Sequence, residues 1–391
     1  TMDMQIELAF GGKEKKKQEP IYEKLSAGTA REINWPITVP YDVDTLSYEV
    51  TAKEKGADTF DRLKVSQKVI KAVPTRTFQA TLTQIRNEFR TDVEKPPDAV
   101  SGRGGVYVQV KPVLAQSLVG VREYMAEYPY TCLEQKVSRS VALRNVDMWQ
   151  SLMKYLPSYL DSDGLMKYFP LMRQGSDVLT AYVLAVAHEA GYKIPAYLQN
   201  RMISGLWGFI EGRVIRYGAL PTADLAIRKI AALEALARYG KIHADSISSI
   251  RIEPNLWPTS AVINWISTLT RAEDIKDRDS RLQEARQVLR SRLTLQGTTM
   301  AFSTEVISSL WWLMESLDST TVKAILALLP FDEWRDDLPR MAAGALGQMR
   351  RGHWDTTTAN AWGVLAIEKF SKKFEATPVT GTVAARIRKH S

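Results

Sequence analysis

Apolar and polar side chains alternate along the start of the chain. One face of this segment is apolar, formed by Met2, Met4, Ile6, Leu8 and Phe10. A period of two is that of a half-buried β-strand. The same alternation recurs further on, at residues 33–39, 46–50, 78–82 and 106–110. Short strands broken by Gly, Pro and Asp predict an antiparallel β-sandwich over residues 1–111.

From about Pro112 the apolar period changes to 3.6, the period of an amphipathic helix. Eleven or twelve helices are predicted, over residues 113–126, 132–156, 176–191, 195–214, 222–239, 258–272, 278–293, 303–317, 319–329, 338–351 and 356–372. Their connections are short and often hold Gly, Pro or Asp, so neighbouring helices are expected to form antiparallel hairpins. This helical domain spans residues 112–373.

A weak strand pattern returns near the end of the chain, at residues 382–387. We interpret residues 374–391 as a return strand to the first domain. The predicted fold is therefore mainly α with a β domain, and the helical domain is inserted into the β-sandwich. An insertion of this kind keeps both ends of the chain in one domain.

Composition and charge narrow the function classes. The chain has 391 residues, 45% of them hydrophobic, which is enough for a large core. A formal charge of +8 raises the question of nucleic acid binding. However, the basic residues are scattered among acids. The densest run, Lys13–Lys17, includes Glu14, and we interpret it as a solvated hairpin loop. No nucleic acid partner is expected.

Membrane and export signals are also missing from the sequence. It has no run of eighteen apolar residues, and its first residues lack the basic start and apolar core of a signal peptide. The chain opens directly in a predicted strand. We interpret it as a fragment of a longer protein.

The single cysteine, Cys132, excludes a disulfide within the chain. One cysteine and four dispersed histidines match no metal-ligand spacing, so neither metal nor cofactor is expected. A free cysteine is usually an inert, small, buried hydrophobe. Here, however, it opens a predicted helix as Cys132-Leu133-Glu134-Gln135. Residues three apart on a helical turn are neighbours, so the Cys132 sulfur can reach the Gln135 carboxamide carbon.

Loss of ammonia from this pair would leave an internal thioester, because holding thiol and amide together makes a sluggish reaction intramolecular. Its acyl carbon, from Gln135, is open to amines, hydroxyls and water. Attack frees the Cys132 thiol and leaves a covalent bond, so the site is a single-use cross-linker and not a turnover catalyst. Water must be excluded until then, and Tyr124, Tyr128 and Tyr130 are candidates for the shield.

These residues resemble the thioester signature Gly-Cys-x-Glu-Gln of the complement and alpha-2-macroglobulin family, with Thr131 at the glycine position. Glu134 and Leu133 belong to the motif and support it. The preceding Tyr128-Pro129-Tyr130 resembles the bacterial members. Two further segments resemble family helices, residues 176–183 and 354–366. The resemblance implies an alpha/alpha toroid of six helical hairpins, bracketed by a macroglobulin or CUB-like β domain.

The resemblance also implies a function. Bacterial relatives are periplasmic proteins, often anchored to the inner membrane by a lipid, and are thought to trap proteases. Cleavage of a bait region exposes the thioester, and the acyl group, here that of Gln135, tethers the attacking protease. The expected partners are proteases and further macroglobulin domains of the full-length protein, and a membrane only through a lipid anchor outside this fragment.

The four histidines bear on which nucleophile attacks the thioester, because family members that favour hydroxyls use a histidine to assist the transfer. We interpret all four as surface or packing residues: His188, His243, His353 and His390. Amines such as lysine side chains are therefore the expected targets.

Two other function classes stay open. Alpha/alpha toroids also house enzymes such as glycosidases, since fold alone does not decide function. The acidic pairs Asp161/Asp163 and Asp336/Asp337 lie beside turn formers, and we interpret them as loop charges and not as an acid and base. Alternatively, the chain is an adhesive or structural module, whose thioester tethers a surface ligand or whose Cys132 never forms the bond.

Overall fold

The structure is a computed structural model. It describes most of the chain, namely residues 1–12, 15–40, 43–69, 85, 88–95, 97, 104–106, 108, 110–218, 224–242, 247, 250, 254–296, 299–302, 310–377 and 379–387. The chain divides into two compact units. One comprises residues 1–78 and 96–104, and the other residues 79–95 and 105–391.

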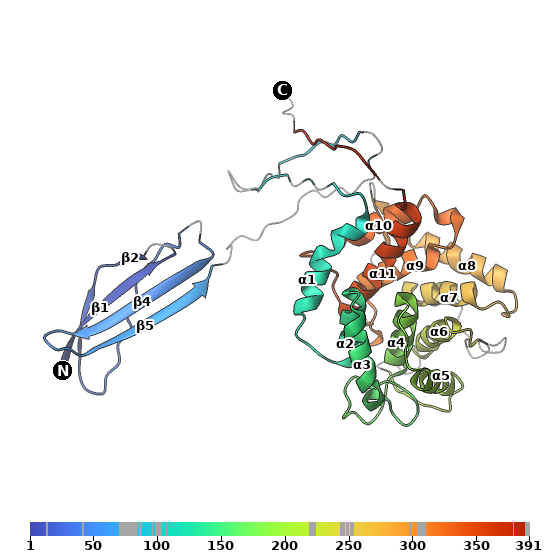
Figure 1. The fold of residues 1–391 in the computed structure, drawn as a ribbon, viewed down its shortest axis with the longest axis horizontal. Helices are drawn as coiled ribbons and strands as arrows, with labels where there is room; N and C mark the ends of the chain where they lie inside the picture. The colour runs from blue at the N-terminus through green and yellow to red at the C-terminus, as the bar shows by residue number, and fades with distance from the viewer. Residues whose placement is uncertain are drawn as a thin grey trace. The chain divides into compact units, whose positions relative to one another are not determined.

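The first unit is one antiparallel sheet (Figure 1). Its strands are β1 (Met2–Gly11), β2 (Lys15–Lys17), β3 (Ile21–Leu25), β4 (Thr45–Glu54) and β5 (Phe60–Lys68). The order is β2-β1-β4-β5, and β3 also pairs with β1. Three buried side chains, Leu8, Phe10 and Leu46, form the centre of its core.

The alternating pattern predicted two of these strands correctly, β1 and the part of β4 at residues 46–50. The prediction at 33–39 is wrong, because this segment forms no ladder. Its Pro36 and the following Pro40 have no N–H to donate. Trp35 and Ile37 nevertheless pack on the sheet core, so the alternation reflects burial and not pairing.

The other strand predictions also differ from the structure. Lys15–Lys17 form β2 and are not simply a loop. Strand β5 was not predicted, since it is exposed on both faces and has no apolar period. The described residues of 106–110 and the segment 382–387 lie outside any strand and are exposed. Residues 78–82 lie outside the described residues. In the described part of this unit there is one sheet layer, not two.

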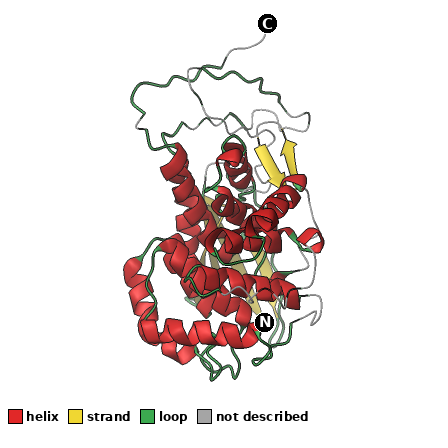
Figure 2. Cartoon of the chain, turned by 90° about the vertical axis from the view of Figure 1, so that its right-hand side faces the viewer, coloured by secondary structure: helices red, strands yellow, loops and turns green. Residues whose placement is uncertain are grey.

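The second unit is mainly helical (Figure 2). Its α-helices are α1 (Val119–Glu127), α2 (Leu133–Ala142), α3 (Val146–Tyr155), α4 (Asp177–Ala190), α5 (Ala196–Ile210), α6 (Leu225–Ala237), α7 (Thr259–Arg271), α8 (Arg278–Ser291), α9 (Leu317–Leu328), α10 (Leu338–Gly347) and α11 (Thr357–Phe374). Short 3₁₀ turns lie between them, such as η1 (Leu114–Leu118), and β6 (Leu293–Gln296) pairs with β7 (Thr299–Phe302).

Most of the predicted helices are present, with two differences. The single helix predicted at 132–156 is two helices, α2 and α3. Arg144 takes a left-handed backbone (φ 51°), and the Asn145 side chain caps α3 by accepting from the Met148 N–H. The helix predicted at 303–317 lies partly outside the described residues, and its described end is a 3₁₀ turn.

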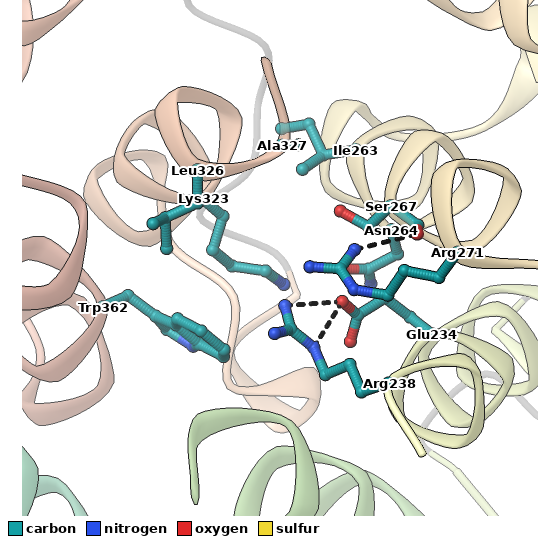
Figure 3. Close-up of a pocket in the computed structure, with 10 residues that line it drawn as sticks. All are labelled: Glu234, Arg238, Ile263, Asn264, Ser267, Arg271, Lys323, Leu326, Ala327 and Trp362. Atoms are coloured by element: carbon teal, nitrogen blue, oxygen red, sulfur yellow. Dashed lines mark hydrogen bonds and ion pairs between the residues drawn. The ribbon is translucent and has the colours of Figure 1, made fainter. Parts of the chain in front are cut away.

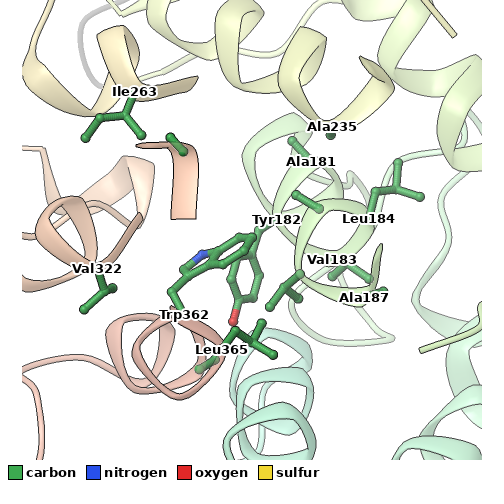
Figure 4. Close-up of a cluster of buried hydrophobic side chains, with 14 of the residues drawn as sticks. Ala181, Tyr182, Val183, Leu184, Ala187, Ala235, Ile263, Val322, Trp362 and Leu365 are labelled. Carbon is green, nitrogen blue, oxygen red and sulfur yellow. The ribbon is translucent and has the colours of Figure 1, made fainter. Parts of the chain in front are cut away.

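Six helices form a closed ring of neighbours. In ring order they are α2, α4, α6, α7, α9 and α11, and α11 packs back onto α2. The sequence explains why these helices lie inside, since α4 and α7 are rich in apolar and small residues and are buried almost all round. In contrast, α3 and α8 bury one stripe of three residues each and cover the outside. Tyr182 and Trp362 meet edge-to-face within the ring (Figure 4).

Charged side chains are also buried within the ring. Arg238 binds the carboxylates of Glu234 and Glu189, and Lys369 binds Glu189 as well. Figure 3 shows Arg238 and Glu234 beside Arg271 and Lys323. Burial alone would raise the pKa of Glu189, but the charges of Arg238 and Lys369 outweigh it and lower the pKa to about 2. Among the described residues, no helix is both long and apolar enough to cross a membrane.

Candidate thioester site

Cys132 lies at the start of ring helix α2. Helix α1 ends at Glu127 because Tyr128 precedes Pro129, and Tyr128 therefore takes an extended backbone (φ −61°, ψ 119°). The chain then turns, and Cys132 is the N-cap residue of α2, also with an extended backbone (φ −66°, ψ 168°). The local sequence thus places the cysteine at the helix end where backbone N–H groups are unpaired.

Cys132 and Gln135 bind each other reciprocally in this first turn. The Gln135 Oε1 accepts from the Cys132 backbone N–H at 2.9 Å. In return, the Cys132 side chain accepts from the Gln135 backbone N–H, which completes a capping box. The carboxamide is therefore folded back over the cysteine. The structure brings together the two side chains that the helical spacing predicts as neighbours.

The surroundings of Cys132 are largely closed to water. Its exposed fraction is 8%. Burial raises the pKa of the Cys132 thiol, although the N–H groups of Gln135 and Glu134 work in the opposite direction. A free thiol here is therefore more protonated, and less reactive, than an exposed one.

The two middle residues of the motif anchor the turn. Leu133 is fully buried, and its N–H donates to the Tyr168 carbonyl oxygen at 2.9 Å. Glu134 is also buried, and its Oε1 accepts from Ser138 at 2.6 Å and from Thr357 of α11 at 2.7 Å. Burial raises the pKa of Glu134, although these two hydrogen bonds lower it in part. Both side chains therefore point into the protein interior.

The three tyrosines form an aromatic row before the motif. Tyr128 meets Tyr124 and Tyr130 edge-to-face, with ring centroids 5.5 Å and 5.6 Å away. Tyr130 is 64% exposed, whereas Tyr128 is partly buried and close enough that the Cys132 charge contributes to its raised pKa, after burial and other groups. A shielding role for this row stays a prediction.

His353 stacks on Tyr124, with parallel rings 3.6 Å apart, and so has a packing contact. The other histidines have different places. His188 meets Tyr239 edge-to-face, and His243 and His390 lie outside the described residues.

Sequence reasoning missed Tyr168, whose carbonyl anchors Leu133. Burial, followed by the nearby Glu134 charge, raises the pKa of Tyr168 to about 12. Tyr168 lies in the loop between Leu160 and Ser176, in which Met166 forms isolated β-bridges with both of these residues. No periodic pattern marks this loop, so no signal in the sequence would have found the residue.

The two further segments that carried the resemblance have structural roles. Ser176 caps α4 by accepting from the Leu179 N–H. Trp354 is fully buried and donates through Nε1 to the Ala345 carbonyl at 2.7 Å. The Asn360 side chain bonds to both the N–H and the carbonyl of Trp354 and so fixes the turn into α11.

The acidic pairs differ from the sequence interpretation in one respect. Asp161 is a buried anchor and not a solvated loop charge. It accepts from the N–H groups of Leu165 and Gly175 and binds Arg216. Burial would raise its pKa, but these partners lower it. Among the described residues, no cluster of three or more His, Cys, Asp or Glu is placed to hold a metal ion.

Comparison with known proteins gives a relative by sequence and several similar solved structures. No family model matches the chain. The sequence is 24% identical over 346 residues to an alpha-2-macroglobulin homolog of Yersinia pestis, covering 81% of this chain and 16% of that protein. The structure resembles native alpha-2-macroglobulin of E. coli with a TM-score of 0.50 and 16% identity, covering 95% of this chain and 24% of that one.

It also resembles Salmonella alpha-2-macroglobulin reacted with methylamine, with a TM-score of 0.51 and 16% identity, covering 94% of this chain and 25% of that one. These likenesses show a mainly helical fold with small sheets, shared with one part of bacterial alpha-2-macroglobulins. The chain spans only 16% of the length of the curated relative that it matches.

Proposed function

We propose that this chain is part of a bacterial alpha-2-macroglobulin, and that Cys132 and Gln135 form its internal thioester. The observation that carries the proposal is the reciprocal capping box, in which the Gln135 carboxamide oxygen lies 2.9 Å from the Cys132 nitrogen. In this proposal the helical ring and its covering helices are an alpha/alpha toroid, bracketed by a β domain. The closed ring order of the inner helices supports that architecture.

The reaction follows from the two side chains. The Cys132 sulfur attacks the Gln135 Cδ, the C–N bond breaks, and ammonia leaves with the thiol proton. When an amine later attacks the same carbon, a C–N bond forms, the C–S bond breaks, and the sulfur takes up the proton lost by the amine. Burial of Cys132 and Leu133 slows hydrolysis before that event.

The whole protein would then act as a single-use protease inhibitor. A protease that cleaves a bait region outside this chain exposes the thioester, and a lysine of the protease is joined to Gln135. The Salmonella relative that has been reacted with methylamine supports an amine as the nucleophile. We place this activity in the periplasm, with a lipid anchor and further macroglobulin domains outside this chain.

Intact mass spectrometry before and after methylamine treatment tests the thioester. The wild-type chain should weigh one ammonia less than its sequence, show no free thiol after denaturation, and gain one methylamine with release of Cys132. Cys132→Ala and Gln135→Ala should show the full sequence mass and gain nothing. A wild-type chain with the full sequence mass and a titratable Cys132 would contradict the proposal.

The protease-trapping step needs its own experiment, since a thioester could tether other ligands. The full-length protein is mixed with a protease and resolved under denaturing, reducing conditions. A covalent adduct that contains both proteins, and that is lost in Gln135→Ala, is expected. An adduct that forms equally well without cleavage by the protease would favour an adhesive module.

A further inference from the structure

A buried chain of hydrogen bonds runs across the ring beside the thioester motif. Tyr182 of α4 lies 2.6 Å from Ser138 of α2, and Ser138 donates to Glu134 at 2.6 Å. Thr357 of α11 donates to the same Glu134 oxygen at 2.7 Å. Side chains of three ring helices, α2, α4 and α11, are therefore joined in one chain of hydrogen bonds.

The members of this chain are almost inaccessible to water. Their exposed fractions are 7% for Thr357, 8% for Glu134, 0% for Ser138 and 8% for Tyr182. In such surroundings a hydrogen bond is stronger than in water, and a polar group that loses its partner is costly. The Glu134–Thr357 bond should therefore hold its two helices firmly.

This bond lies where the ring closes. Helix α2 is the first ring helix and α11 the last, and Glu134 and Thr357 are 223 residues apart in sequence. Thr357 is the first residue of α11, directly after the Thr356 cap, so its backbone is itself fixed. The closure thus brings a rigid partner to the first turn of α2.

Glu134 lies between the two reactive residues in that turn. Cys132 precedes the helix and Gln135 follows Glu134 directly, so a shift of the Glu134 backbone moves both. We propose that Glu134 is a positioning residue: through Thr357 it holds the first turn of α2 at the ring closure and so keeps Cys132 and Gln135 in reacting geometry. The chemical consequence rests on the proposed thioester.

Three threonine variants test the bond. Thr357→Val keeps the shape of the side chain and removes the donor, and Thr357→Ser keeps the donor. Thr321→Val is the matched control, since Thr321 is a buried ring residue of α9 that bonds only to the Leu317 carbonyl among the contacts described. Tyr182 is the last member of the hydrogen-bonded chain, and Tyr182→Phe is a milder variant to use if Thr357→Val does not fold.

Hydrogen exchange at the amides of Leu133 and Lys136 is the first readout, because both amides are bonded in the first turn of α2, to Tyr168 and Cys132. Thr357→Val should raise their exchange about tenfold. Thr357→Ser should restore wild-type exchange, and Thr321→Val should leave it unchanged. Adding Thr357→Val to Glu134→Ala should give no further rise, since Glu134→Ala already removes the bond that Thr357→Val breaks.

Thioester yield is the second readout, measured by intact mass. Thr357→Val should lower the fraction of chains that lack one ammonia by about tenfold relative to wild type, and Thr357→Ser should recover it. Exchange in Thr357→Val that equals that in Thr321→Val, or additive effects in the double variant, would overturn the inference. If wild type carries no thioester, the proposed function fails, while hydrogen exchange still decides the positioning role.

Discussion

The helical ring and the sheet bury their residues in different ways. Ring helices α4 and α7, and most of α11, are buried on nearly every side, and buried polar side chains such as Thr268 and Asn360 have hydrogen-bond partners. The centre of the sheet core has three buried side chains, and β5 is exposed along its whole length. A sheet with so small a core is marginal by itself. The Cys132–Gln135 motif therefore lies in the unit that has the larger buried core.

Breaking the buried ion cluster of the ring should have the largest effect. Glu189→Gln removes one of the two carboxylates that the buried Arg238 binds, and it also removes the partner of Lys369, so the free energy of unfolding should fall by about 3–5 kcal/mol. Denaturant unfolding followed by tryptophan fluorescence measures this. Glu211→Gln, whose partner Arg213 is exposed, is the control and should cost under about 1 kcal/mol. Equal losses for the two variants would show that burial does not set the cost.

The sheet core offers the next largest effect. Leu46 is 1% exposed, and Leu46→Ala should destabilise the sheet by about 2–4 kcal/mol. Amide hydrogen exchange should become faster in β1 and β4 and stay unchanged in the ring helices. Leu63→Ala, in a residue that is 62% exposed on β5, should have little effect. Faster exchange in the ring as well would mean that the two units unfold together.

An acid near the ring's last helix should make stability depend on pH. Asp318 is buried and accepts from the Asp355 N–H at 2.9 Å. Burial, together with the Asp355 charge, raises the pKa of Asp318 from 3.8 to about 6. The folded state then binds the proton more tightly than the unfolded state, so the free energy of unfolding should fall as pH rises from about 4 to about 6, by about 1–3 kcal/mol.

Asp318→Asn removes this titration, and its unfolding free energy should change less over that pH range. Denaturant unfolding at several pH values compares the two proteins. The same slope in wild type and in Asp318→Asn would assign the pH dependence to another group.

The smallest effect is expected at an outer helix. The Asn145 side chain accepts from the Met148 N–H at 2.8 Å and caps α3. Asn145→Ala should lower the unfolding free energy by about 1 kcal/mol. Gln150→Ala, at an exposed position of the same helix, should stay within about 0.5 kcal/mol of wild type. A larger loss at Gln150 would mean that the outer face of α3 has a partner.

The candidate site was predictable as far as its local geometry. Cys132 and Gln135 are three residues apart, and the helical repeat alone brings them together. The partners of Glu134 were not predictable, because Thr357 is 223 residues away and only ring closure brings it near. Tyr168 was missed for a similar reason, since its contact with Leu133 is made by an irregular loop.

The sequence by itself determined those features that depend on neighbours in the chain. Alternation specified β1, Pro129 ended α1 before the motif, and Ser176 and Thr356 capped their helices. These effects act within one or two turns. No contact with the rest of the protein is needed to produce them.

Tertiary structure alone decided which helices form the ring, and it enclosed the Glu134 carboxyl between α2 and α11. It also left residues 33–39 outside the sheet and paired the exposed β5 with β4. The physical reason is that pairing and burial depend on the total area that the whole chain removes from water, and no local window of sequence contains that quantity.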